Sequence, residues 1–211
     1  RCFGRLVMAQ RVDENAVVAA VRAAESRTSG QIVCVLARQS SDPAAFVMLY
    51  AAALALIAPW PLLEWTQASA QLVFAAQIGV FVLVLAALGW TPLGVALTPR
   101  VVKRRQAYGV ALEQFFAHGL GRTRSRAGVL IFVSIAEHYA RIIADHALDD
   151  RISDRDWRAA VEEMTAHLRE GRVTEGFISA IIRSADLLAR AAPPDGGDGG
   201  NELPDNLVRL N

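Results

Sequence analysis

Uncharged residues run almost unbroken through the middle of this chain. Between Asp42 and Arg100 the only charged residue is Glu64, which separates two apolar stretches, 43–63 and 65–99. A helix needs roughly 20 apolar residues to cross a bilayer core of about 30 Å, and lipid permits little except helices at that depth. Each stretch is long enough, so the pattern predicts two membrane-spanning helices.

We expect the first helix to span about 44–63 and the second about 72–90, so that 43–99 forms a transmembrane helical hairpin. The residues from Pro59 to Trp65 would make the short turn between the helices, where their tryptophans suit the membrane interface.

The charges that flank the hairpin predict its orientation. Basic residues lie on both outer sides of it, and the connecting turn contains no Lys or Arg. The positive-inside rule then places both ends in the cytoplasm. We therefore expect a multi-pass membrane protein with both termini and the soluble part cytoplasmic. The flanking basic residues are Arg38, Arg100, Lys103, Arg104 and Arg105.

The first 30 residues contain no apolar segment of the kind found in signal peptides, so we expect the hairpin to act as the membrane signal. Position 1 is not a methionine, and Met8 is a candidate for the true start of the chain.

Before the hairpin, the pattern predicts one helix and one strand. Asp13 can cap a helix that Ser29 and Gly30 bring to an end. Residues 31–38 then form a continuous apolar run of strand length, which is typical of a strand covered on both faces.

After the hairpin, apolar residues recur at helical spacing from Val101 until the glycines near 119–121. Two further apolar runs, 127–135 and 138–145, predict strands that a tight turn joins, so they should pair antiparallel.

Two helices should close the soluble part. Ser153 and Asp156 form a capping box that begins the first of them. Thr174 is a candidate cap for the second, which Pro193 should stop.

This order predicts an α/β fold, a small α/β/α sandwich with a mixed sheet that the hairpin interrupts. The soluble domain would comprise 1–42 and 100–192, and its first two strands should be parallel, with the hairpin inside their crossover. Residues 193–211 form an acidic tail rich in glycine and proline, which we expect to be flexible. Apolar residues near its end leave open whether the tail docks.

Composition and charge exclude several functions. The chain has 22 basic and 21 acidic residues and a net charge of +1, which argues against a nucleic-acid binder, because phosphate binding needs a basic surplus. Only two cysteines occur, Cys2 and Cys34, so the chain has neither a disulfide framework nor the cysteine spacing of a metal site.

One set of residues in the soluble part is distinctive in its order and spacing more than in any single motif. The set comprises Phe115 to Leu120, Thr123, Gly128 to Ser134, Ile143 to Asp145, Trp157, and the pair Gly171 and Gly176 before Ile181. These segments resemble the TPM domain family, and its bacterial membrane branch is the most similar. The resemblance covers about 12–193, is strongest over 107–190 and extends to a tail like 201–205.

Membership of this family implies an α/β/α sandwich. For some members it also implies acid-phosphatase activity or divalent-cation binding, with roles in maintaining photosystems or other membrane complexes.

Acidic residues near the end of the third predicted strand are the candidates for such a cation, calcium or magnesium, because hard cations bind several converging carboxylates. They are Asp145, Asp149, Asp150 and Asp154, with His146 among them. The alternative is a solvated acidic loop. The chain also departs from the metal-binding members of the family: Arg126 and Ala127 stand where those members carry an acidic or amide residue. We therefore expect no cofactor, with a divalent cation as the alternative.

Phosphatase chemistry needs a nucleophile, a base or metal pair and a phosphate cradle. The sequence contains no Cys-x5-Arg loop, no Asp-x-Asp pair and no glycine-rich phosphate loop. Its four histidines are scattered over different predicted elements. We assign no catalytic residue and expect a protein that is not an enzyme.

Arginines form the most concentrated basic group. Anionic lipid headgroups are natural partners for such residues, and the alternative is topogenic charge together with a solvated loop. The candidates for lipid or phosphate contact are Arg104, Arg105, Arg122, Arg124 and Arg126.

The leading hypothesis is a membrane-anchored TPM-like domain that binds membrane lipids and a membrane protein complex and helps to assemble or maintain that complex. Two alternatives remain: a metal-assisted phosphatase that uses the loop from Asp145 to Asp154, and a scaffold that binds anionic lipid.

Overall fold

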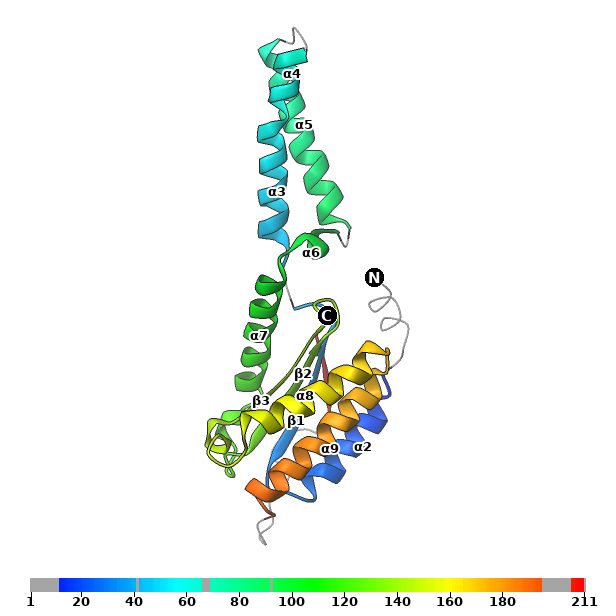
Figure 1. Ribbon diagram of the computed structural model, residues 1–211, viewed down its shortest axis with the longest axis vertical. Coiled ribbons are helices and arrows are strands. Elements are labelled where there is room, and N and C mark those ends of the chain that lie inside the picture. The colour runs from blue at the N-terminus through cyan, green and yellow to red at the C-terminus, as the bar shows by residue number, and fades with distance from the viewer. Residues whose placement is uncertain (1–11, 41, 66–68, 92, 195–205, 211) are drawn as a thin grey trace. The chain divides into compact units, whose positions relative to one another are not determined.

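The computed structural model in Figure 1 describes residues 12–40, 42–65, 69–91, 93–194 and 206–210. Met8, Cys2 and residues 201–205 lie outside these ranges. The chain divides into two compact units. The first comprises Arg1–Ser40 and Arg104–Asn211, and the second is the inserted segment Ser41–Lys103.

A four-stranded sheet with the order β3-β2-β1-β4 forms the centre of the first unit. Its strands are β1 (Gln31–Ala37), β2 (Gly128–Ser134), β3 (Tyr139–Ala144) and β4 (Leu207–Leu210). β1 is parallel to β2 and to β4, and β2 is antiparallel to β3. The mixed sheet, the parallel first pair and the antiparallel second pair confirm the predicted α/β fold.

Helices cover both faces of this sheet, which is why β1 and β2 read as continuous apolar runs. On one face lie α2 (Glu14–Glu25), α8 (Asp154–Arg169) and α9 (Val173–Ala191), and on the other lies α7 (Arg100–Ala117) (Figure 1). Alternate side chains of the strands enter the two cores. Ile32 and Val129, for example, contact the three-helix side, and Val33 and Phe132 contact the α7 side.

Two of the three predicted helix caps are present. The Asp13 side chain accepts a hydrogen bond of 3.1 Å from the amide of Ala16. The Ser153 hydroxyl caps α8 by accepting the amide of Asp156, and it donates to the Asp156 carboxylate at 2.7 Å.

The predicted cap at Thr174 is wrong. The last helix begins at Val173, and the residue at its N-cap is Arg172, whose side chain makes no capping hydrogen bond. Gly171, at φ 80°, ends α8 so closely before Val173 that Thr174 already lies inside the new helix. Its hydroxyl oxygen instead accepts the amide of Asp13 at 3.1 Å and so joins the starts of α2 and α9.

The tail does dock at its end. β4 adds to the free edge of β1, and the amide of Arg38 extends the pairing by donating to the carbonyl of Leu210 at 3.0 Å. Leu207 is buried against the three-helix core, and Arg209 forms an ion pair of 2.6 Å with Glu14. Two short 3-10 helices, η1 (Leu120–Arg122) and η2 (His146–Leu148), complete this unit.

The second unit is helical, with α3 (Ala44–Ile57), α4 (Pro59–Trp65), α5 (Ala70–Gly89) and α6 (Leu93–Leu97). Two segments of it are long and apolar enough to cross a membrane: Ala44–Trp65, with a mean hydropathy of 2.0, and Ala70–Gly89, with a mean hydropathy of 2.5. The large apolar side chains of these helices are exposed, such as Leu49, Phe74 and Leu83.

The turn predicted between Pro59 and Trp65 is wrong, because these residues form α4. Proline is well tolerated in the first turn of a helix, where its missing N–H would have no partner. α4 follows α3 after the single residue Ala58, and the two helices together make the first candidate span.

Candidate functional site

A buried carboxylate lies where β3 ends. Asp145 is only 4% exposed, and its backbone N–H donates to the carbonyl of Gly128 at 2.9 Å, which fixes it beside the start of β2. Its Oδ1 accepts the amide of Ala147 at 2.9 Å and so caps η2. The Oδ1 atom of Asp145 is therefore used to cap the short helix that follows β3.

Arg126 provides the charge that faces the other oxygen of this carboxylate. Its Nε lies 3.6 Å from Oδ2 of Asp145, and this oxygen has no hydrogen-bond partner among the described residues. Arg126 adopts the left-handed conformation, with φ 50°, in the loop that leads into β2. A buried carboxylate is costly without an opposing charge, so Arg126 acts first as the structural partner of Asp145.

The remaining acidic candidates are exposed, and two of them make local pairs. Asp149 pairs with the imidazole of His146, and this hydrogen bond, followed by the negative charge of Asp149, raises the pKa of His146. Asp154 lies 3.6 Å from Arg158 one helical turn later, and Asp150 is exposed. Within the described ranges no three carboxylate, histidine or cysteine side chains come close enough to hold a metal ion. The geometry does not favour a cation site among these residues.

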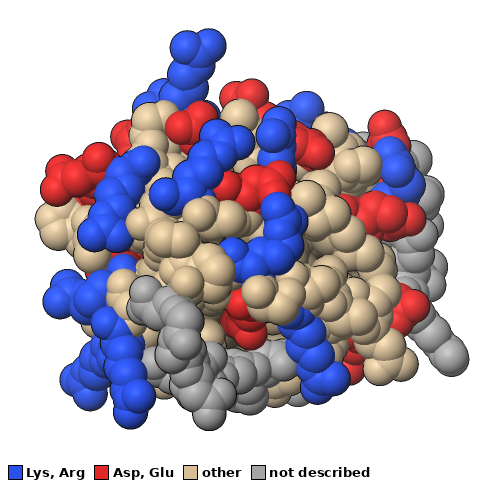
Figure 2. Space-filling model, turned by 90° about the horizontal axis from the view of Figure 1, so that it is seen from below, with Lys and Arg blue, Asp and Glu red and all other residues tan. Residues whose placement is uncertain are grey.

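The five basic candidates separate into two groups. Arg104 and Arg105 lie in the early turns of α7, whereas Arg122, Arg124 and Arg126 follow its last turn. At a rise of 1.5 Å per residue the helix separates the two groups by about 18 Å, so they do not form one patch. Seen from below, basic and acidic side chains alternate over the surface (Figure 2).

Sequence reasoning missed a polar network at the opposite end of the sheet. The Ser134 hydroxyl, at the end of β2, donates to the carboxylate of Glu137. Ser40 donates from its hydroxyl to Ser134 at 2.7 Å and from its amide to Glu137 at 3.0 Å. Serine and glutamate are common in loops, so no local pattern could have predicted that these three meet.

This network continues the sheet up to the inserted segment. Beyond the last paired residues of β1 and β2, the amides of Ile135 and Ala136 donate to the carbonyls of Ala37 and Arg38, each at 3.0 Å. Ser40 is the last residue of the first unit before the insertion. The chain is therefore hydrogen-bonded to the sheet until it leaves the domain.

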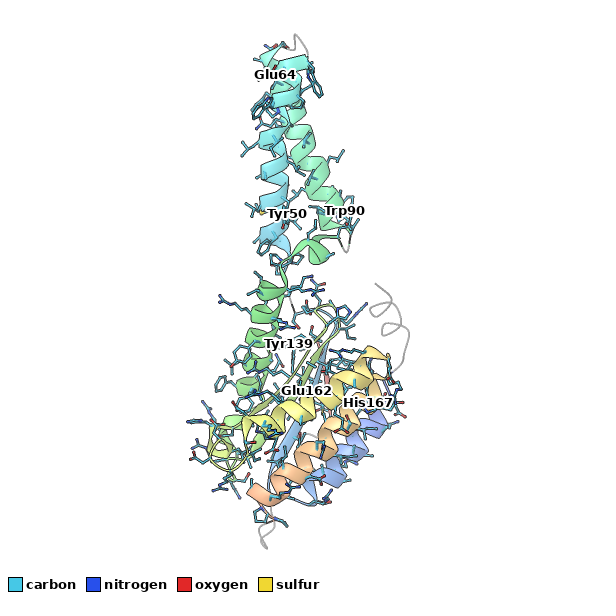
Figure 3. All side chains as sticks on the ribbon, in the orientation of Figure 1. Tyr50, Glu64, Trp90, Tyr139, Glu162 and His167 are labelled. Carbon is cyan, nitrogen blue, oxygen red and sulfur yellow. The ribbon has the colours of Figure 1, made fainter. Side chains whose placement is uncertain are left out.

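Cys34 and the four histidines do not gather into one site within the described residues, although the Ser134 hydroxyl donates to the Glu137 carboxylate. Cys34 is fully buried in β1, and burial strongly raises the pKa of its thiol, which disfavours the reactive thiolate. His118 and His138 lie in separate turns, His146 begins η2, and His167 lies on α8, where Figure 3 labels it.

Comparisons with known proteins agree with this architecture. Residues 91–187 match the model of the TPM domain family. The solved structure of the BA42 protein from the psychrophilic bacterium Bizionia argentinensis, determined by NMR, is similar with a TM-score of 0.57 and 19% sequence identity. The match covers 93% of this chain and 91% of that chain. At this identity the likeness concerns the fold alone. No curated protein matches the chain.

Proposed function

Because this chain contains a TPM domain, we propose that it is a membrane-anchored docking domain that is not an enzyme, and that it binds protein partners in membrane complexes and supports their assembly or maintenance. In this proposal the inserted helices span the bacterial inner membrane, and both termini and the TPM domain lie in the cytoplasm. No nucleic acid or cofactor takes part.

The position of the two apolar helices is the observation that carries the proposal. They are inserted between β1 and β2, which pair in parallel from Gln31 with Gly128 to Ala37 with Ser134. An anchor that served localisation alone would work equally well at either end of the chain. Insertion into a crossover connects the domain to the membrane at two covalent points, one after Ser40 and one before Arg104.

Two connections restrict the orientations of the domain more than one flexible linker would. Ordering a protein when it binds its partner costs free energy, and any ordering present beforehand reduces that cost. The hydrogen bonds from Ser40 to Ser134 and Glu137 support the same argument, because they hold the first connection on the sheet. A domain presented in this way is suited to docking on a neighbour in the same membrane.

The test is to move the anchor without removing it. In one variant, residues 41–103 are transferred to the N-terminus and a short Gly-Ser linker replaces them between Ser40 and Arg104. The natural chain and this variant, each with an N-terminal affinity tag, are purified from solubilised membranes, and an anchor comprising only 41–103 is the control. We expect the natural chain to retain partners that the control does not, and the transferred anchor to lose most of them.

Equal recovery of the same partners from both full-length forms, or no partner above the control, would contradict the proposal. Turnover of an aryl phosphate by the purified chain, abolished when Asp149 and Asp150 are both changed to alanine, would favour the phosphatase alternative instead. No observation in the described residues favours that alternative. Asp145 forms an ion pair with Arg126, and the other aspartates do not come together into a group that could hold a metal ion.

A further inference from the structure

An open pocket of about 500 Å³ lies in the first unit, where the turn between β2 and β3 approaches the end of α8. Its apolar lining includes Val133, Leu168 and Val173, and its cationic lining consists of Arg104 and Arg169, with His138 in the turn. The lining contains no acidic residue. A second pocket on the surface of α8 and α9 differs in this respect, because Glu163, Glu175 and Asp186 line it.

The two arginines of the first pocket carry charges that the described residues do not neutralise. Neither Arg104 nor Arg169 forms an ion pair with a carboxylate in the described ranges. Both side chains are exposed. By contrast, Arg183 near the second pocket is paired with Glu163 at 3.0 Å. Guanidinium groups that are not engaged by carboxylates are suited to phosphate, which they bind with two parallel hydrogen bonds.

Two hydroxyl groups of this pocket are engaged elsewhere. The hydroxyl of Thr165 donates to the carbonyl of Val161 at 2.6 Å, and the hydroxyl of Ser134 donates to Glu137. Tyr139, labelled on β3 in Figure 3, packs its ring against Phe132 with 6.5 Å between ring centroids. Its hydroxyl and the imidazole of His138 are further polar groups of the lining, and the two arginines are its permanently charged donors.

We propose that this pocket binds a phosphorylated amphiphile, with the phosphate on Arg104 and Arg169 and the apolar part against Val133, Leu168 and Val173. Its volume falls in the range of small-molecule sites, roughly 300–1,000 Å³. The phosphate can belong to a lipid headgroup or to a soluble phosphate ester. This inference does not depend on the docking function, because ligand binding here needs no protein partner.

The chain connections favour the lipid source. Arg104, which lines the pocket, is the first residue of the domain after the inserted helices. Ser40, the last residue before them, is hydrogen-bonded to Ser134 in the pocket wall. When the inserted helices span a bilayer, both connections lead from this pocket to the membrane.

The experiment measures lipid binding by the full chain in a non-ionic detergent. Calorimetric titrations with dioctanoyl phosphatidic acid, dioctanoyl phosphatidylcholine and inorganic phosphate compare an anionic lipid, a lipid without net charge and free phosphate. We expect saturable binding of phosphatidic acid and at least tenfold weaker binding of phosphatidylcholine. The variant Arg104→Gln/Arg169→Gln should weaken the binding of phosphatidic acid at least tenfold.

The variant Arg155→Gln/Arg190→Gln is the matched control. It removes the same charge from exposed positions on α8 and α9 that do not line the pocket, and it should change the affinity less than twofold. Both variants should unfold at the temperature of the natural chain, because none of the four arginines forms an ion pair in the described residues. Equal loss of affinity in the two variants, or no saturable binding of any probe, would overturn the proposal. Inorganic phosphate binding as tightly as phosphatidic acid, with the same dependence on Arg104 and Arg169, would support the pocket and assign it to soluble phosphates.

Discussion

At the scale of single residues, the ion pair between Arg126 and Asp145 joins the loop before β2 to the end of β3. The carboxylate is buried and the guanidinium is largely exposed. The resemblance to the TPM family implied only that Arg126 and Ala127 stand where metal-binding members carry an acidic or amide residue. It did not indicate which carboxylate the arginine faces, because the two residues come together only when β2 and β3 pair.

Replacing Arg126 by glutamine should destabilise the domain. The carboxylate of Asp145 would then be buried without an opposing charge, at a cost of about 1–3 kcal/mol. Arg126→Lys should cost less because it keeps the charge. Thermal unfolding in detergent measures the effect, and adding Asp145→Asn to Arg126→Gln should recover part of the loss. If Arg126→Gln leaves the midpoint of thermal unfolding unchanged, the ion pair contributes nothing to the stability of the domain.

His146 should titrate above its ordinary pKa, because its hydrogen bond with Asp149 favours the protonated imidazole. The pair therefore contributes stability below the pKa of the unfolded chain, and this contribution is lost as the pH rises through the higher pKa of the folded state. Side-chain NMR of His146 measures the midpoint directly. Asp149→Asn should shift the midpoint downward, and an unchanged midpoint would mean that the pair does not form in solution.

At the scale of elements, strands β1 and β2 were predictable because helices cover both faces and leave continuous apolar runs. Strand β4 was not predictable, since it has only four residues and follows a segment rich in glycine and proline. Helix α4 was missed because two prolines and two tryptophans between apolar helices also suit a turn. The network of Ser40, Ser134 and Glu137 depends on contacts far apart in the sequence, which local patterns do not contain.

Gly128 allows η1 to approach the start of β2 closely, because glycine has no Cβ. A Cβ at this position would collide with the backbone of Leu120, whose carbonyl carbon would lie only 2.9 Å away. Because backbone cannot yield as a flexible side chain can, Gly128→Ala should destabilise the domain by about 1–3 kcal/mol. Gly109→Ala on α7 is the matched control, since nothing lies within 4 Å of its Cβ, and it should stabilise the helix by up to about 1 kcal/mol. Equal unfolding temperatures for the two variants would contradict this account.

At the scale of the whole molecule, the apolar middle of the sequence predicted both the two helices and their place inside the soluble fold. In the structure β1 and β2 lie on either side of the insertion in the sequence and pair in parallel within one sheet. The proposed cytoplasmic position of the domain is argued from flanking charge, and the proposed partner from the docking function. Both depend on interactions outside the chain, which is why neither its sequence nor its fold specifies them.

The central claim is the proposal that the inserted helices cross a membrane, so that the connection between α4 and α5 lies on one side of it and the α/β domain on the other. Single cysteines at Ser69, which caps α5, and at Arg155 on α8 test it in a chain whose Cys2 and Cys34 are replaced by alanine. A maleimide that cannot cross membranes is added to intact spheroplasts and to lysed ones. The account predicts labelling of Ser69→Cys in intact spheroplasts and of Arg155→Cys only after lysis. Labelling of Arg155→Cys in intact spheroplasts, or of both sites only after lysis, would contradict it.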